Sequence, residues 1–218
     1  MNTNDGVKYY SPLEERINIF SHAAGLFLSI LALIILVIHA STNGNVWHIV
    51  SFSIFGISLI ILYSASTFYH SSKSPELRQK MRIIDHASIY VLIAGTYTPY
   101  TLVTLNGTTG WLIFSVIWAL ALSGIILKLF FTGRFKLIST SMYLFMGWMI
   151  IFAVKPLIDN LHSDGLLWLV IGGISYTLGA ILYGIKQIKL NHAIFHVFVL
   201  IGSFSHFVSI FFYVLPHN

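Results

Sequence analysis

Seven long apolar stretches follow one another along the chain, separated by short polar connections. A helix needs roughly 20 mainly apolar residues to cross the hydrocarbon core of a bilayer. The pattern therefore predicts an all-α, polytopic integral membrane protein with seven transmembrane helices, built as a single membrane domain over residues 1–218. The predicted spans are 18–39, 46–70, 83–104, 110–130, 136–155, 166–186 and 192–214.

The composition supports a membrane protein. Hydrophobic residues make up 56% of the 218 residues and charged residues 9%, with a mean hydropathy of +0.82. A soluble domain of this size could not bury so much apolar surface. Cysteine is absent, which excludes disulfides and thiolate metal ligands. Residues 1–17 lack the pattern of a cleaved signal peptide, so we expect the first span to be retained.

Positive residues are distributed unevenly between the two ends of the predicted spans. Eleven of the twelve fall before span one or around the connections of spans two and three, four and five, and six and seven. They are Lys8, Arg16, Lys73, Arg78, Lys80, Arg82, Lys128, Arg134, Lys136, Lys186 and Lys189. Because Lys and Arg accumulate on the cytoplasmic side, we expect a cytoplasmic N-terminus and an external C-terminus. The net charge of +5 then reports orientation, and no nucleic-acid partner is predicted.

Two further features bear on helix packing. Span six contains Ser175 and Gly179, and Ala180 and Gly184, which are pairs of small residues four positions apart. Such pairs allow close contact between membrane helices. Pro99 lies inside span three and is expected to kink that helix, with neighbouring groups satisfying the freed carbonyl.

Four polar residues are expected to meet in one layer near the cytoplasmic surface. His70 ends span two, Asp85 opens span three, and His192 and His196 open span seven. A helix rises about 1.5 Å per residue, which places all four within roughly 10 Å of that surface. His192 and His196 are four apart and share a helix face. Three imidazoles beside a carboxylate suit zinc, which in catalytic sites has three protein ligands and an open position.

Asp85 and Ser66 are expected beside the metal. Ser66 precedes His70 by four residues, so it lies one turn deeper on the same face, where it can hydrogen-bond a ligand or the bound water. Asp85 is either a fourth ligand or the group that holds and deprotonates this water, and we favour the second role. A purely structural alternative is that Asp85 pairs with Arg82 or caps span three.

The remaining polar residues near this layer leave alternatives open. Glu15, Asn18 and His22 share one stripe at the start of span one. They either cap the helix and pack inside the bundle, or His22 is a rival metal ligand. His86 is rotated by about 100° from Asp85 and is left out of the site. His206 lies roughly 20 Å further along its helix than His192 and is expected to be a packed polar residue.

Several short motifs, in this order, resemble the hemolysin III branch of the progestin and adipoQ receptor family. They are E-R-I-N-I-F-S-H from Glu15 to His22, S-T-F-Y-H from Ser66 to His70, Asp85 at the start of span three, and H-A-I-F-H from His192 to His196. The resemblance implies a zinc site of His70, His192 and His196, with Asp85 and Ser66 beside it. It also implies kinship with membrane ceramidases and a short, bacterial type of multi-pass plasma membrane protein.

Three functions follow as hypotheses. The first is a zinc-dependent hydrolase of a lipid amide or ester at the cytoplasmic leaflet, with a membrane lipid as substrate or ligand. The second is a non-enzymatic sensor or regulator of the membrane in which zinc has a structural role. The third is a haemolytic pore, which would need a continuous polar path, whereas the outer half of the predicted spans is mostly apolar.

Overall fold

The computed structural model describes residues 8–131 and 136–215. Within these ranges the chain is helical apart from short connections. The helices are α1 (Pro12–Asn43), α2 (Val46–Ser71), α3 (Pro75–Pro99), η1 (Tyr100–Leu105), α4 (Gly107–Phe131), α5 (Lys136–Trp148), η2 (Met149–Ala153), α6 (Val154–Asn160), α7 (Ser163–Gly184), α8 (Asn191–Ser209) and η3 (Ile210–Val214). Arg134, which entered the charge argument, lies outside the described residues.

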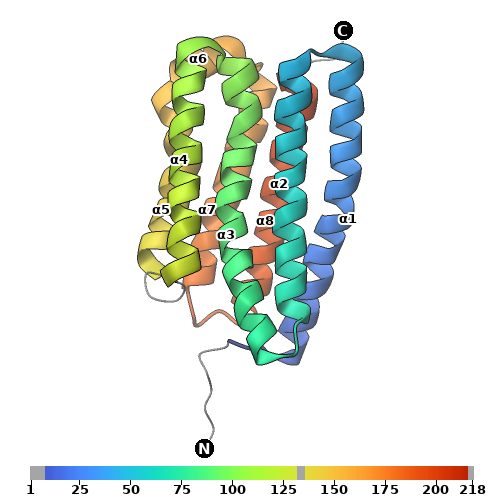
Figure 1. The fold of residues 1–218 in the computed structure, drawn as a ribbon, viewed down its shortest axis with the longest axis vertical. Helices are drawn as coiled ribbons and strands as arrows, with labels where there is room; N and C mark the ends of the chain where they lie inside the picture. Colours follow the sequence, from blue (N-terminus) through green and yellow to red (C-terminus); the bar gives the residue numbers. More distant parts are fainter. Residues whose placement is uncertain (1–7, 132–135, 216–218) are drawn as a thin grey trace, which may run out of the picture.

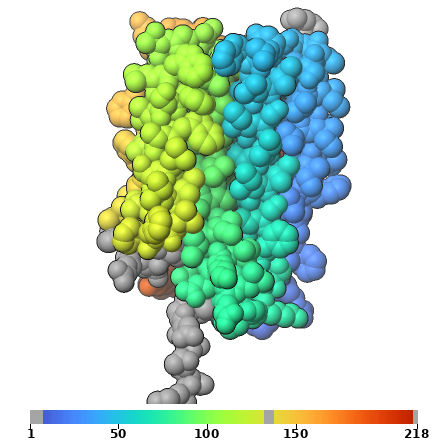
Figure 2. All heavy atoms as spheres, in the orientation of Figure 1, coloured from blue at the N-terminus to red at the C-terminus, as the bar shows by residue number. Residues whose placement is uncertain are grey.

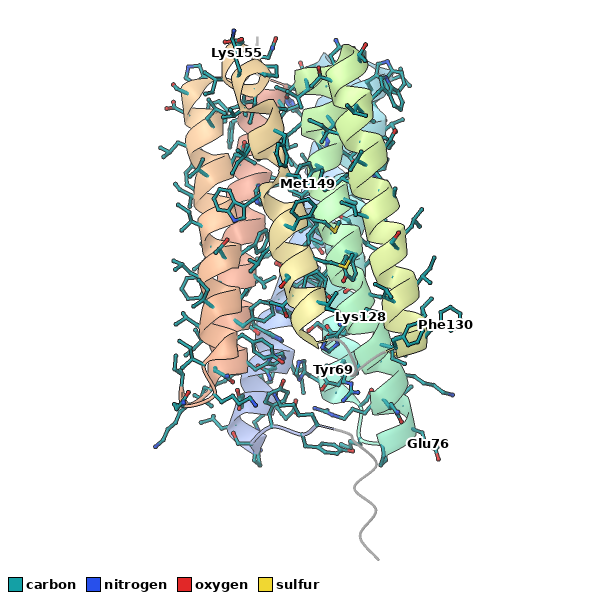
Figure 3. All side chains as sticks on the ribbon, turned by 90° about the vertical axis from the view of Figure 1, so that its left-hand side faces the viewer. Tyr69, Glu76, Lys128, Phe130, Met149 and Lys155 are labelled. Carbon is teal, nitrogen blue, oxygen red and sulfur yellow. The ribbon has the colours of Figure 1, made fainter. Side chains whose placement is uncertain are left out.

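These helices form seven rods along an elongated bundle, with α3 continuing into η1, α5 into η2 and α6, and α8 into η3 (Figure 1). The predicted seven-helix, all-α architecture is confirmed for the described residues. The connections at 72–74 and 185–190 lie at one end, here called the basic end because Lys73, Lys186 and Lys189 belong to it. Lys155 lies at the opposite end from Glu76 (Figure 3).

Six of the rods are long and apolar enough to cross a membrane, and α3 is not among them. Its first half carries charged residues and its second half carries hydroxyl groups, so its mean hydropathy is low. These residues are Glu76, Arg78, Lys80, Arg82, Asp85, Thr96, Tyr97 and Thr98. The helix nevertheless packs between α2 and α4 and runs along the bundle with them (Figure 1). Because its neighbours cover it, α3 can be more polar than a helix surrounded by lipid.

Large apolar side chains cover the outside of the bundle. Phe20, Phe130 and Phe152 are 73%, 74% and 79% exposed, and Phe130 points away from the bundle in Figure 3. Figure 2 shows one face of the bundle, where α4, α3, α2 and α1 follow one another from left to right. A soluble protein does not leave apolar surface of this extent in water, whereas lipid tails cover it in a bilayer. The chain is a multi-pass membrane protein.

Small residues bring α7 close to α8. A Cβ atom on Gly172 would lie 2.6 Å from Nε2 of His206, and one on Gly179 would lie 2.7 Å from Cβ of Phe198. The close contact predicted at Gly179 is therefore present. Gly184 has no neighbour within 4 Å of such a Cβ, so this residue does not contribute to the contact.

The helix geometry of α3 changes directly after Pro99, where the α-helix is followed by the π-helix η1. Proline has no backbone N–H and cannot donate the usual bond within a helix. A second break, between α5 and η2, is stabilised by Tyr97 of α3. Its hydroxyl donates to the Gly147 carbonyl (3.0 Å) and accepts from the Ile150 N–H (2.9 Å). Polar groups freed at the break are thus satisfied inside the bundle.

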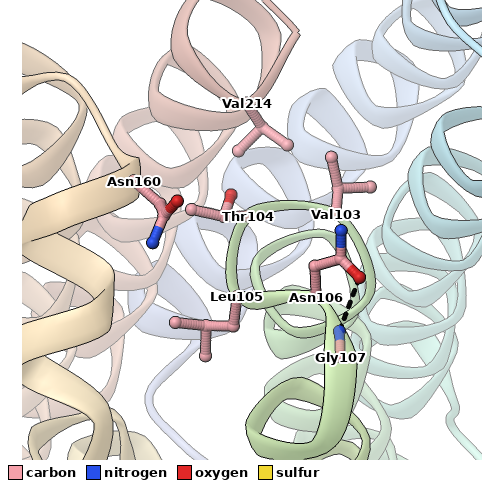
Figure 4. A pocket seen from close by; sticks show the side chains of 7 residues that line it. All are labelled: Val103, Thr104, Leu105, Asn106, Gly107, Asn160 and Val214. Carbon is pink, nitrogen blue, oxygen red and sulfur yellow. Dashed lines mark hydrogen bonds between the residues drawn. The ribbon is translucent and has the colours of Figure 1, made fainter.

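An open depression of about 530 Å³ lies at the end opposite the basic end, between η1, α6 and η3 (Figure 4). Asn106 and Gly107, which both have positive φ angles of 50° and 51°, form the turn beside it. The Gly107 N–H donates to the Asn106 side-chain oxygen. This depression is separated from His70, His192 and His196 by the length of the bundle.

Gly95 provides a test of the packing between α2 and α3. A Cβ atom at this position would meet the buried Ser58 side chain, so Gly95→Ala should lower the free energy of unfolding by about 1–3 kcal/mol. Gly147→Ala is the matched control because nothing lies within 4 Å of its Cβ position, and the better helix propensity of alanine should keep or raise stability. Thermal unfolding in detergent measures both, and equal midpoints for the two variants would contradict the proposed close contact.

Candidate metal centre

Three buried histidines meet at the basic end of the bundle. His70 ends α2, and His192 and His196 occupy the first two turns of α8. Their Nε2 atoms face one another, with His192 3.0 Å from His70 and 3.1 Å from His196. One ligand nitrogen from each ring lies within 4.8 Å of the other two. The structure thus brings together the three histidines that the sequence proposes as metal ligands.

Glu15 of α1 orients His70. The Nδ1–H of His70 donates to Oε2 of Glu15 over 2.7 Å. Because a neutral imidazole carries one proton, this bond leaves a lone pair on Nε2, which faces the other two histidines. A carboxylate behind a histidine is the usual support of a metal ligand and raises its basicity. The Asn18 amide also lies 3.4 Å from the same Nδ1 atom.

The three nitrogens fit a metal ion. In a tetrahedral zinc site the Zn–N distance of about 2.0–2.1 Å places nitrogen ligands about 3.3–3.4 Å apart, close to the separations found between the Nε2 atoms. Each ring is 7% exposed or less, so water reaches the nitrogens poorly. Nitrogen lone pairs that are held close together in a buried site are favourable when they bind one cation. This cluster can therefore hold a metal ion.

Arg78 of α3 holds the other side of Glu15. Its guanidinium pairs with Oε1 of Glu15. Arg78 is 1% exposed, and among the described residues it is the largest side chain that is fully buried. It also donates to the backbone oxygens of Lys8, Tyr69, His70 and Ser72, over 3.0, 3.2, 3.3 and 3.4 Å. The last carbonyls of a helix have no partner within it. Arg78 therefore caps α2 at the residue that supplies the first ligand.

The beginning of α8 is also held by α1. The backbone N–H of His192 donates to Oε1 of the buried Glu14 over 3.2 Å, and a negative charge is favourable at a helix N-terminus. The hydroxyl of Ser21 lies 3.4 Å from Nδ1 of His196. The helix α1, which carries no residue of the ligand group, thus contacts both α2 and α8, which do.

Residues 8–11 cover the cluster from the basic end. The Tyr10 ring stacks on the His192 ring with 4.5 Å between centroids and 11° between planes. Its backbone N–H donates to Glu15 (3.0 Å), and the Lys8 ammonium lies 4.3 Å from its ring centroid. Burial raises the pKa of the Tyr10 phenol, so the hydroxyl remains protonated.

Asp85 and Ser66 lie next to each other. The Ser66 hydroxyl is close to the Asp85 carboxylate, but the two groups are not positioned for a well-formed hydrogen bond. Asp85 does not belong to the group of ligand atoms within 4.8 Å of one another. The Asp85 carboxylate is within electrostatic range of Tyr10, Tyr69 and Tyr183. The rings of these tyrosines contact His70 or His192. Asp85 thus borders the space around the centre without entering the ligand cluster.

The other histidines take different positions. His22 is buried against the centre, with its ring stacked on His196 at 3.5 Å and 10°, but its nitrogens do not join the ligand group. His86 donates from Nδ1 to the Arg82 carbonyl (2.6 Å), and this nitrogen lies 3.7 Å from Asp85. His206 stacks on Tyr176 deep in the bundle. None of these three rings therefore supplies a nitrogen to the ligand cluster.

Sequence reasoning did not identify the supporting residues Glu14, Ser21, Arg78 and Tyr10, and it left Glu15 either as a helix cap or in a direct role at the site. A signal for Glu15 was available, because it shares the stripe of Asn18 and His22. Its two partners, however, lie 55 and 63 residues away in the chain. Arg78 entered only as one positive charge among those that set orientation.

Glu15→Gln tests the support of His70. An amide is a weaker acceptor than a carboxylate, and it leaves the buried Arg78 without its ionic partner. Loss of a group that supports a metal ligand commonly lowers metal affinity about 10–100-fold, and we expect a loss in that range for zinc. Equilibrium competition with a chelator measures it. Glu76→Gln, at an exposed residue in the first turn of α3, is the control, and equal affinities for the two variants would exclude this role of Glu15.

Comparison with known proteins places this arrangement in a family. The family model described as "Haemolysin-III related" matches residues 10–207. "Hemolysin-3" of Bacillus cereus is 49% identical over 203 residues, which cover 93% of each chain, and "Hemolysin-3 homolog" of Bacillus subtilis (strain 168) is 49% identical over 200 residues, which cover 92% of this chain and 94% of that protein. The human "Monocyte to macrophage differentiation factor" is 28% identical over 208 residues, covering 92% of this chain and 84% of that protein. The chain therefore belongs to the haemolysin-III related family, as its motifs predicted.

Proposed function

We propose that this protein is a zinc-dependent hydrolase that cleaves an amide or ester bond of a membrane lipid. The observation that carries the proposal is a buried group of three histidines, with the Asp85 carboxylate outside the group and within electrostatic range of Tyr10 and Tyr183. This leaves a coordination position for water or substrate, as catalytic zinc sites require. A structural zinc site would instead use four protein ligands.

His70, His192 and His196 would hold the ion through Nε2. When bound, zinc supplies a Lewis acid that polarises a carbonyl oxygen and makes water acidic near neutral pH. Asp85 would accept the proton of the attacking water and return it to the departing nitrogen or oxygen, as the carbon–oxygen bond forms and the linkage to the leaving group breaks. Ser66 would orient the Asp85 carboxylate through its hydroxyl.

The location of the centre suits a lipid linkage. We place the basic end in the cytoplasm, because the positive residues gather there and Lys155 lies at the other end. The ligands lie in the last turn of α2 and in the first turns of α8, near the ends of membrane-spanning helices. Amide and ester bonds of lipids lie at the same depth, between the headgroup and the hydrocarbon tails.

A second function is favoured by one observation. Tyr10 and the backbone of residues 8–11 cover the histidines closely, as would suit a metal that holds helices together in a sensor or regulator of the membrane. The hydrolase and the sensor differ in that only the hydrolase converts a substrate into product. A pore is not favoured, because the interior between the two ends is filled by large buried side chains such as Phe52, Phe55 and Tyr90.

Metal analysis of the purified protein tests the centre. We expect zinc to co-purify with the wild-type chain, and both His192→Ala and His196→Ala to lose most of it, because two nitrogens cannot hold the ion in a buried three-ligand site. His162→Ala, an exposed histidine at the opposite end, should keep the wild-type content. Unchanged zinc in both α8 variants would disprove the metal centre.

Asp85→Asn tests the chemistry. The variant should keep its zinc, because we assign Asp85 a role outside the three ligands, but it should hydrolyse lipid amides or esters about 10²–10⁴-fold more slowly, as expected for loss of a general base. Rates are measured in proteoliposomes, with Asp159→Asn at an exposed position of α6 as the control. An Asp85→Asn protein as fast as the wild type would refute the role. A wild type without turnover that loses thermal stability when zinc is removed would support the sensor.

A further inference from the structure

The two helices that carry the ligands are not close neighbours. α2 packs mainly against α1 and α3, whereas α8 packs mainly against α7 and α1. His70 and His192 therefore approach each other across the bundle interior. A metal site tolerates displacements of only about 0.5 Å in its ligands, so something other than direct packing must hold α2 in register with α8.

A buried hydrogen bond joins the same two helices deeper in the bundle. The Tyr63 hydroxyl of α2 donates to Oγ of Ser203 in α8 over 2.8 Å, and both side chains are buried. Tyr63 precedes His70 by seven residues, and Ser203 follows His196 by seven. Seven residues are nearly two helical turns, or roughly 10 Å. Each partner therefore lies on the same face as a ligand, at a similar depth below it.

The residues of α1 leave room for this crossing. A Cβ atom on Gly25 would lie 2.6 Å from Cδ1 and Cε1 of the Tyr63 ring, so only glycine lets the tyrosine pass. One turn earlier on α1, His22 lies between the two ligand helices. Its face stacks on the His196 ring, and the Tyr63 ring meets it edge to face with 5.0 Å between centroids. The ligand His196 and the bridging Tyr63 thus contact the same imidazole.

Ser203 has a second partner that supplies a matched comparison. The Tyr176 hydroxyl of α7 lies 3.0 Å from the same Oγ. Tyr63, which is buried, and Tyr176, which is partly buried, are both phenols bonded to one serine, but α7 carries no residue of the ligand group. Removing either hydroxyl leaves Ser203 with the other partner, so both phenylalanine variants should fold.

We propose that the Tyr63–Ser203 hydrogen bond positions α2 against α8 and thereby sets the distance between His70 and the two ligands of α8. Tyr63 and Ser203 act as positioning residues for metal binding. The inference rests on the proposed metal centre and adds to it a determinant outside the ligands and their immediate partners. Tyr176 stabilises the bundle through the same serine without affecting the ligand spacing.

Zinc titration of the metal-free, full-length protein tests this role, with a competing chelator to report affinity. Tyr63→Phe should bind zinc about tenfold more weakly, at the lower end of the losses seen for groups that support metal ligands. Tyr176→Phe should keep the wild-type affinity. Cobalt substituted for zinc should show an altered absorption spectrum in Tyr63→Phe alone, because its ligand geometry changes.

Thermal unfolding of the metal-free proteins separates positioning from general stability. Each phenylalanine variant loses one hydrogen bond to the buried Ser203 and should lose a similar amount of stability, so stability alone cannot account for a difference in affinity. The double variant Tyr63→Phe/Ser203→Ala should bind zinc no more weakly than Ser203→Ala, since the two changes remove one interaction.

The outcomes distinguish this inference from the proposed function. If the wild type binds zinc and Tyr63→Phe binds it equally well with the same cobalt spectrum, the positioning role is wrong while the centre stands. If Tyr176→Phe weakens binding as much as Tyr63→Phe does, the network is merely structural and the inference is again overturned. If the wild type itself binds no zinc, the centre and the inference are both rejected.

Discussion

The architecture of the basic end depends on one partly buried carboxylate, that of Glu15. It is shared between the Nδ1–H of His70 and the guanidinium of Arg78. An ionised group in such surroundings is costly unless each of its oxygens is paired, and both are. Arg78 in turn satisfies carbonyls at the end of α2 and in the N-terminal segment. One charge pair therefore joins α1, α2, α3 and residues 8–11 at the point where the first ligand is presented.

This constraint explains why α1 is central to a centre to which it contributes no ligand. Glu15 orients His70, Glu14 accepts from the first turn of α8, and Ser21 and His22 contact His196. Metal ligands usually need such partners to select the tautomer and the ring orientation. Deeper in the bundle, Gly25 lets Tyr63 reach α8 past the same helix. The helix α1 contacts both α2 and α8, and these contacts hold the two helices in place relative to each other.

The same geometry limits what the centre can do. The ligand nitrogens are enclosed by Tyr10 and the N-terminal segment, so a large hydrophilic substrate would not reach them from the aqueous side without displacing that segment. The carboxylate of Asp85 stays outside the group of three nitrogens, so the centre separates its candidate ligands from the acidic group that the proposed hydrolysis would use.

The sequence by itself determined the polytopic, all-helical class, because helices exposed to lipid must be apolar over their whole length. It also predicted one depth for His70, His192, His196 and Asp85, since charge and helical rise are local properties. Only the tertiary structure decided how these residues meet. It made Glu15 the partner of His70, put Arg78 in the interior, kept Asp85 out of the ligand cluster, and stacked His22 on a ligand. These contacts join helices that are far apart in the chain, and no periodicity within one helix records which face of another helix it will meet.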